Sequence, residues 1–457
     1  MNSSPAQCAP ATAAEPLSRL AVPATASRGM LMATVVGTGD MAAHFRRFST
    51  LIGPRHWTKC VQGVKEVLRG NPFLRDFLTR ENEIATSLSQ YGELLDRYGD
   101  RVDVITGRLE LYPALAFATQ VLSIADGLPA VKAKRFVRRV QGAFGNPDDM
   151  RGLRLELTVA THFIRRGQVP VWPEMSEELA VQGQTQFDFL LPALGTGLEI
   201  ECKSISGDKG RRIRQREALE FHHLVFERNK QLIDRLEDGL AVVVTVPDRL
   251  PAQYQARVEL VRAVRSQLLS AQSASLADGT EIRIADFDTS AAPRGDPSAM
   301  RTFIESVSGT RNRDGMLRGN GLGGALVFVT RSARDDEMMD ATFRTLGDAA
   351  RRQLSGNRAG LLVAGFDAIS SEGLQAVAAQ DLDPHQPETA LNNRIRRFFS
   401  GDGRNHIVNA AFLSRGAIQP VGPGELDSGG SVYNFPNRGS RYWSEDFANL
   451  FNPPQAN

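Results

Sequence analysis

The chain has 457 residues, of which 42% are hydrophobic and 23% are charged, and its formal net charge is +2. This composition is typical of a globular protein with two or three domains. The near-neutral charge gives no sign of nucleic-acid binding, so any basic surface must be local. Cys8, Cys60 and Cys202 are too few and too scattered for a disulfide framework or a zinc motif, which fits a reducing cytoplasm.

Residues 1–40 are rich in Ala, Pro and Ser and lack the basic start and the continuous apolar core of a signal peptide. We interpret them as a disordered leader. Residues 41–146 are predicted to form a helical domain, because apolar residues recur every three to four positions in 58–70, 73–99 and 128–144. No apolar run reaches the length of about 18 residues that a transmembrane helix needs.

The pattern changes near residue 147, where Asn146 and Pro147 are typical of a helix start. The predicted order from there is a helix to Gly167, a short strand in 168–175, two strands in 186–206, a helix ending near Glu237, a strand at 240–247, a helix at 252–271 and a strand at 280–288. Strands mixed with helices in this order predict an α/β domain over 147–290, with a mixed sheet flanked by helices.

The C-terminal region, residues 300–457, is predicted to be α/β as well. Strands at 324–330 and 359–367 flank a helix that ends near Leu354, which is the pattern of a parallel crossover. Helices near 372–380 and 387–399 and a buried strand at 406–414 follow, and the tail from Pro420 is expected to be irregular. These strands either extend the first sheet or build a second one.

The strand pair in 186–206 carries an unusual set of charges. Strand side chains alternate between faces, so Glu199, Glu201 and Lys203 share one face, while the other face is apolar. Asp188 lies on the preceding strand among apolar residues. Such charges on a buried strand are costly unless water, a metal or a partner compensates them. A carboxylate pair beside a lysine is what a divalent-metal phosphodiesterase site requires.

Residues 147–290 resemble the PD-(D/E)xK nuclease superfamily, which has the restriction-endonuclease-like fold. That family carries an acid on its second strand and an acid-x-Lys on its third, and the matching positions here are Asp188, Glu201 and Lys203. Many members add a Glu on the first helix, where this chain has Glu156. Phe187 stands where the motif has Pro. The flanking regions resemble no family.

The resemblance implies a catalytic set of Glu156, Asp188, Glu201 and Lys203. Asp188, Glu201 and the backbone carbonyl of Cys202 would bind Mg²⁺, with Mn²⁺ as a substitute. Lys203 would position the attacking water or stabilise the developing charge, and Glu156 would bind the metal through water or accept a proton. The alternatives are a solvent-facing acid at Asp188, a cross-strand ion pair of Glu201 and Lys203 on a solvated face, and an exposed helix position at Glu156. Glu199 is expected to be structural.

Basic residues follow the acid-x-Lys strand within eight positions, at Lys209, Arg211, Arg212, Arg214 and Arg216. We interpret them as a nucleic-acid-binding loop, because Lys and Arg clusters bind the phosphate backbone and are unfavourable near a helix N-terminus. The alternative is a solvated helix start.

Other polar clusters are expected to be structural. His222 and His223 lack the spacing of a metal motif and are interpreted as packing or surface residues. The basic clusters within 132–139 and 394–397 are interpreted as solvated helix faces, and 319–324 as a loop.

The sequence therefore predicts a cytoplasmic, magnesium-dependent nuclease, with an endonuclease and a DNA substrate favoured and no membrane association. Restriction, phage defence and repair are equally open as its setting. The rival hypotheses are a catalytically silent nucleic-acid-binding or scaffold module with the same fold, an RNase, and an unrelated α/β protein with a chance motif. Members of the family are often dimers, so a homodimer or an unidentified partner protein also fits.

Overall fold

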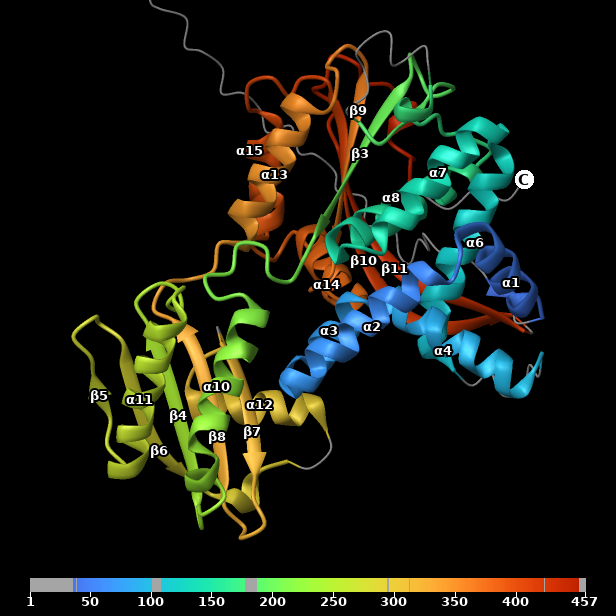
Figure 1. The fold of residues 1–457 in the computed structure, drawn as a ribbon. Coiled ribbons are helices and arrows are strands. Elements are labelled where there is room, and N and C mark those ends of the chain that lie inside the picture. The colour runs from blue at the N-terminus through green and yellow to red at the C-terminus, as the bar shows by residue number, and fades with distance from the viewer. Residues whose placement is uncertain are drawn as a thin grey trace, which may run out of the picture.

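The computed structural model describes residues 36–37, 39–100, 108–176, 187–293, 296–311, 313–422 and 424–451. Over these ranges the protein is mixed α/β, and each of its two sheets is flanked by helices (Figure 1). The fold class is therefore confirmed at the level of a mixed α/β protein.

The expected helical region is confirmed. It contains α1 (Met41–Ile52), α2 (Arg55–Gly70), α3 (Arg75–Glu81), α4 (Glu83–Tyr98), α6 (Tyr112–Gly127) and α7 (Ala130–Ala143). Helix α6 is buried on nearly all sides because its sequence is apolar all round, and it contacts α1, α4, α7 and α8. Most of the expected leader lies outside the described residues, but β1 (Val36–Gly37) is a strand at the edge of a sheet.

The larger sheet, which we call sheet A, has the strand order β1-β11-β10-β9-β3-β2. Its other strands are β2 (Phe189–Leu191), β3 (Leu198–Ile205), β9 (Ala359–Phe366), β10 (Ile407–Gly422) and β11 (Glu425–Pro436). Strands β3, β9 and β10 are parallel neighbours, and the other pairs are antiparallel. Because β3 and β9 are covered on both faces, they consist of near-continuous buried residues, as parallel strands do.

Helices cover both faces of sheet A. Helix α8 (Pro147–Arg165) packs on one face with the helical region, and Leu153 and Leu157 enter the same core as Val363. Asn146 caps α8 by accepting a hydrogen bond from the Asp148 N–H, as its sequence predicts. Helices α13 (Met338–Arg352), α14 (Ser371–Leu382) and α15 (Ala390–Phe399) fill the core on the opposite face.

The smaller sheet, sheet B, has the order β5-β6-β4-β8-β7. Its strands are β4 (Gly239–Val246), β5 (Ala274–Ser275), β6 (Glu281–Phe287), β7 (Asp314–Gly319) and β8 (Ala325–Ser332). Helices α10 (Gln215–Ile233) and α11 (Tyr254–Ser270) share one core with sheet B, and α12 (Pro297–Ser308) contacts its other core. The chain leaves sheet A after β3 and returns before α13, so residues 211–336 form an inserted lobe (Figure 1).

This topology corrects the expectation of one α/β unit over 147–290. Strands β4 and β6 belong to sheet B, and the parallel neighbour of β3 is β9, which lies beyond residue 290. The expected parallel crossover is also wrong, because β8 and β9 lie in different sheets. An apolar run predicts that a strand is buried, but it carries no information about which strand lies beside it.

Two local expectations are wrong as well. Residues 168–175 form only a single bridge from Val171 to Leu190 and then a 3₁₀ turn, because Pro170 and Pro173 have no N–H for a ladder. The tail is regular as far as Pro436, since β11 pairs along β10, whereas residues 437–451 form turns and a 3₁₀ turn. Alternating apolar residues such as Val432 and Tyr433 enter the two cores of sheet A and hold this strand in place.

Candidate functional site

Asp188 lies at the edge of sheet A, directly before β2. Its N–H donates to the Ile200 carbonyl at 3.1 Å, and its carboxylate accepts a hydrogen bond from the Cys202 N–H at 2.6 Å. The Asp188 side chain therefore binds the backbone of β3 just before β2 starts to pair with that strand. This contact turns Asp188 toward β3, so the alternative of a solvent-facing strand-end acid is wrong.

Glu201 and Lys203 lie two positions apart on β3 and form an ion pair, with 2.5 Å between Glu201 Oε1 and Lys203 Nζ. Glu201 is 1% exposed, whereas the Lys203 side chain is 24% exposed. Since this pair lies along one strand and its carboxylate is buried, it is not a cross-strand pair on a solvated face. Glu201 Oε2 is buried without a hydrogen-bond partner in the described structure, which costs free energy unless another group binds it.

Glu156 projects from α8 and is also buried, so it is not an exposed helix position. Both of its carboxylate oxygens accept hydrogen bonds from one terminal nitrogen of Arg139, at 2.6 and 2.5 Å. The other terminal nitrogen of Arg139 donates to Glu174 at 3.1 Å. Arg139, which belongs to a cluster interpreted as a solvated helix face, therefore orients a candidate catalytic acid.

The sequence contains a signal for this role of Arg139. It lies three positions after Phe136 and four before Ala143, both of which are buried on α7. Residues at those spacings share one helix face, so the face that carries Arg139 packs inward.

The carboxyl groups of Glu156, Asp188 and Glu201 interact electrostatically. Burial, followed by the charge of Asp188, raises the pKa of Glu156 to about 8 and that of Glu201 to about 8. Burial also raises the pKa of Asp188, although the Cys202 N–H and the charges of Lys203 and Arg139 oppose this shift. Three carboxyl groups that resist ionisation together form a site in which a bound cation would be stabilising.

The donor set fits a divalent cation of the Mg²⁺ type. Asp188 and Glu201 supply carboxylate oxygens, and the Glu201 oxygen without a partner is available as a ligand. Mg²⁺ commonly uses one or two carboxylates and keeps several waters. Within the described ranges, no three His, Cys, Asp or Glu side chains are arranged around one metal position. The expected ligation by the Cys202 carbonyl stays a prediction.

Glu199 lies on the same strand but belongs to a different contact. It is fully buried, and its carboxylate accepts hydrogen bonds from the Ser355 N–H at 2.7 Å and the Ser355 hydroxyl at 2.5 Å. These bonds fix the loop between α13 and β9. The expectation that Glu199 is structural agrees with this contact.

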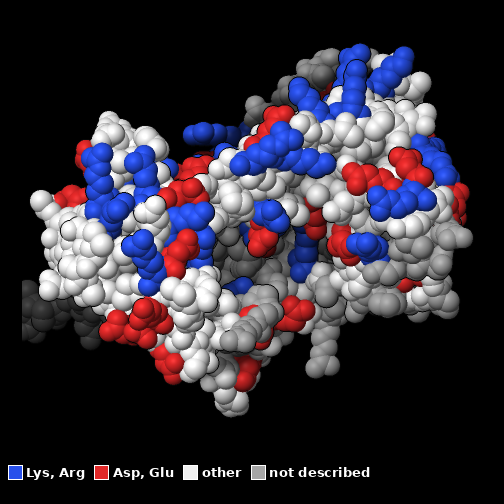
Figure 2. All heavy atoms as spheres, turned by 60° about the horizontal axis from the view of Figure 1, so that its bottom comes forward, with Lys and Arg blue, Asp and Glu red and all other residues white. Residues whose placement is uncertain are grey.

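A cleft of about 1740 Å³ lies between sheet A and the inserted lobe, and basic side chains predominate in it. Twelve Lys or Arg and eight Asp or Glu residues line it among those described. Figure 2 shows basic and acidic side chains around a hollow in the surface. The basic ones are Arg80, Arg151, Arg154, Lys209, Arg211, Arg212, Arg214, Arg216, Arg249, Arg257, Arg344 and Arg415. None of the four expected catalytic residues lines this cleft, which begins one position later on β3, at Ser204.

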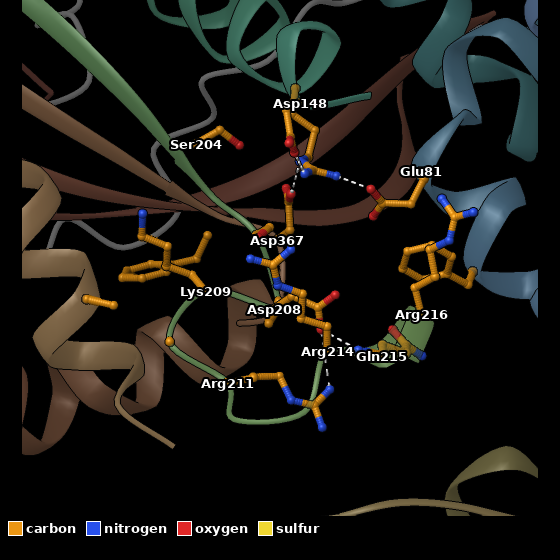
Figure 3. A pocket seen from close by; sticks show the side chains of 18 of the residues that line it. Glu81, Asp148, Ser204, Asp208, Lys209, Arg211, Arg214, Gln215, Arg216 and Asp367 are labelled. Atoms are coloured by element: carbon orange, nitrogen blue, oxygen red, sulfur yellow. Dashed lines mark hydrogen bonds and ion pairs between the residues drawn. The ribbon is translucent and has the colours of Figure 1, made fainter. Parts of the chain in front are cut away.

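The predicted nucleic-acid-binding loop lines this cleft, but its members differ in their contacts. Arg211 binds Asp314 at 2.7 Å, and Arg212 pairs with Glu337, so both are engaged within the hinge and the inserted lobe. Lys209 and Arg214 make no ion pair with any described residue. Figure 3 shows Lys209, Arg211 and Arg214 of this loop across the cleft from Asp148 of α8.

The remaining polar clusters are structural. The buried His222 ring lies 3.0 Å from the Thr330 hydroxyl, and His223 lies 3.0 Å from the Gly70 carbonyl, so the packing interpretation is confirmed. Residues 320–324 form the loop between β7, which ends at Gly319, and β8, so the expectation of a loop within 319–324 is confirmed.

No family model, curated protein or solved structure matches this chain. Among the described helices, none combines the length and the apolar composition that a membrane span requires.

Proposed function

We propose that this protein is a divalent-metal-dependent nuclease whose active site contains Glu156, Asp188, Glu201 and Lys203. The observation that carries this proposal is the cluster of buried carboxyl groups, in which burial raises the pKa of all three acids and the charge of Asp188 further raises that of Glu156 and Glu201. A cluster held together at that electrostatic cost is expected to have a functional role. The resemblance to the PD-(D/E)xK superfamily also supports the proposal, because it implies a catalytic role for the same four residues.

Each side chain has a role that follows from its contacts. Asp188 and Glu201 would hold the cation, which when bound supplies a water of lowered pKa and polarises a phosphoryl oxygen. The partly exposed Lys203 ammonium would bind the phosphate and stabilise developing negative charge. Glu156 would accept a proton, and Arg139 holds its carboxylate in one orientation by two hydrogen bonds.

The favoured substrate is DNA, and the favoured action is endonucleolytic. The support for a nucleic acid is the cleft beside the carboxyl end of β3, where Lys and Arg outnumber Asp and Glu. Restriction, phage defence and repair are all compatible with this chemistry.

The test is a cleavage assay with supercoiled plasmid, linear DNA and RNA, in Mg²⁺, Mn²⁺ or EDTA. We expect metal-dependent cleavage that falls at least about 100-fold in Asp188→Asn, Glu201→Gln and Lys203→Ala. Glu199→Gln is the matched control, because it changes a buried carboxylate of the same strand that binds only the loop before β9. Its activity per folded molecule should stay near that of the wild type.

The substrate that is cut decides between a DNase and an RNase, and nicking of the plasmid identifies an endonuclease. If nothing is cut and Mg²⁺ or Mn²⁺ leaves the melting temperature unchanged, the nuclease proposal fails. Retained nucleic-acid binding would then favour the catalytically silent module.

A further inference from the structure

The cations that line the cleft between the lobes differ in whether they are already paired. Of the twelve, eight form an ion pair with a described acid. The other four form none within the described ranges, and they are Arg80, Lys209, Arg214 and Arg249. Their charges are not offset by a bound acid, so they dominate the attraction of the cleft for an anion.

Three of these unpaired cations meet at the first turn of α10. Arg214 directly precedes the helix, and Arg80 of α3 donates a hydrogen bond of 2.6 Å to the side chain of its first residue, Gln215. Lys209 lies in the same loop as Arg214, directly after Asp208. The Asp208 carboxylate accepts a hydrogen bond from the Gln215 N–H at 2.9 Å, which holds the Lys209 segment against the helix start (Figure 3).

The fourth unpaired cation, Arg249, belongs to the loop after β4 in the inserted lobe. It is exposed, and its neighbour Leu250 packs in the same core as Ile213, which lies in the loop before α10. Its other neighbour, Asp248, lies 3.7 Å from Arg212 of that same loop. These two contacts place Arg249 beside the start of α10. The four unpaired cations therefore form one surface, which we call the α10 patch.

The acids around the α10 patch are already engaged with other groups. Asp208 and Glu217 accept hydrogen bonds from backbone N–H groups at the start of α10, at 2.9 and 3.2 Å. Negative charge is favourable at that end of a helix, so these acids are stabilised where they lie. Glu220 pairs with Arg216 at 2.9 Å. The cations of the patch are therefore left to bind an anion from outside the chain.

An aromatic ring lies beside the patch. Phe77, which is half-buried and lines the cleft, lies about one helical turn before Arg80 on α3. The guanidinium carbon of Arg80 is 5.9 Å from the centroid of the Phe77 ring. Proteins that bind nucleic-acid strands without reading their sequence combine a basic groove with aromatic rings on which bases stack. This combination favours a polynucleotide over an acidic polypeptide, because Asp and Glu side chains carry no ring.

We propose that the α10 patch binds the sugar-phosphate backbone of a polynucleotide, with its four cations on about four phosphates. The inference rests on the proposed function and extends it, because it names a polynucleotide, rather than a nucleotide or a small phosphodiester, as the substrate. Lys209 follows Lys203 by six residues, so their Cα atoms are at most about 22 Å apart. One strand of a duplex has a phosphate every ~3.4 Å along the axis, so about six base pairs reach from the patch to the proposed active site.

The experiment is a fluorescence anisotropy titration of the full chain carrying Asp188→Asn, in EDTA, at several salt concentrations. The probe is a labelled DNA of about 12 nucleotides, single-stranded or in a duplex, which is about twice the length needed to reach the active site. Four phosphate contacts should make log Kd rise with log salt concentration at a slope of about 3.6 for the duplex and about 2.8 for the single strand. AMP, which offers one phosphate, should compete at least about 100-fold more weakly than unlabelled DNA.

Arg214→Gln and Arg249→Gln should each lower the slope by about one and weaken binding about eightfold near ~0.1 M salt, because one fewer counterion is released. Arg216→Gln is the matched control. Arg216 lies at the same helix start, is exposed like Arg214 and loses the same charge, but Glu220 offsets that charge. The control should leave the slope unchanged and the affinity within about twofold. All three side chains are exposed, so circular dichroism should show the wild-type fold in each variant.

The inference is overturned if the two patch variants keep the wild-type slope or if Arg216→Gln lowers the slope as much as they do. It is also overturned if AMP or polyglutamate displaces the probe as well as unlabelled DNA does. These outcomes do not depend on catalysis, because the binding is measured without metal and without the Asp188 carboxylate. If the wild type cuts nothing while the patch binds DNA, only the nuclease proposal is contradicted. If the wild type cuts DNA and the patch variants bind it normally, only this inference is contradicted.

Discussion

At the scale of single residues, the buried acids make the stability of the protein depend on pH. Burial raises the pKa of Glu201 from 4.5 to about 8. Between these values the folded protein keeps a proton that the unfolded chain loses, so its stability falls as the pH rises through that interval. Without metal, the contribution is fully present below pH 4.5 and is lost above about pH 8.

We therefore predict that Glu201→Gln, measured in EDTA, loses less stability between pH 5 and 9 than the wild type. One such proton changes the unfolding free energy by at most about 1.4 kcal/mol per pH unit. The measurement is urea unfolding at several pH values. The double variant Glu156→Gln/Glu201→Gln should flatten the dependence further, because the pKa of Glu156 is raised to about 8 as well. If the unfolding free energy has the same pH dependence in all three proteins, groups other than Glu156 and Glu201 cause that dependence.

The sequence pattern predicts this site in part. The period-two alternation on β3 places Glu201 and Lys203 on one face, and the structure places Asp188 beside them. The pattern of α7 indicates that the face carrying Arg139 packs inward, but it does not identify Glu156 as the partner, because Glu156 lies on another helix. Which group a charged residue of a helix meets depends on what packs against that helix, which the local pattern does not contain.

At the scale of elements, the periodicity of the sequence predicts the helices and most of the strands. It does not predict which strands lie side by side in a sheet. Strands β3 and β9 are separated by the whole inserted lobe, and yet they pair in parallel over eight positions. Both strands are buried along most of their length, which does not select one buried neighbour over another. Helix α8 packs closely on β9, where a Cβ at Gly365 would come within 2.8 Å of Leu155.

The hinge between the lobes depends on one glycine. Gly210 has φ +75, a conformation that side chains disfavour, and its carbonyl accepts a hydrogen bond from the Glu337 N–H at 2.8 Å. A Cβ at this position would come within 2.6 Å of the Glu337 backbone. The two hinge segments can therefore pass this close only when residue 210 has no side chain.

We predict that Gly210→Ala lowers the unfolding free energy by about 2–4 kcal/mol, from strain and overlap together. Gly356→Ala is the matched control, because Gly356 has φ +74 but no neighbouring atom within 4 Å of its Cβ position. It should cost only about 1 kcal/mol. Urea unfolding measures both, and cleavage by trypsin should increase near residue 210 only in Gly210→Ala. Equal losses in the two variants would mean that overlap with Glu337 contributes nothing.

At the scale of the whole molecule, the inserted lobe is built as a separate folding unit. It contains its own sheet and its own cores, and the chain leaves and returns at the hydrogen-bonded pair of Gly210 and Glu337. The lobe also contacts the helical region, where Phe73 packs on Phe226 at 5.4 Å between ring centroids. The helical region therefore contacts the inserted lobe as well as sheet A.

We predict that replacing residues 211–336 by a short Gly/Ser linker leaves a folded protein, since the two ends are already adjacent. The exposure of Phe73 should cost about 1–2 kcal/mol. Circular dichroism and urea unfolding would measure the remaining fold. Stabilisation by Mg²⁺ should persist because Asp188 and Glu201 lie in sheet A, whereas nucleic-acid affinity should fall because the inserted lobe forms one wall of the cleft. If the shortened chain does not fold, the inserted lobe is needed to hold sheet A together. If it folds and keeps full nucleic-acid affinity, the binding surface lies outside the cleft.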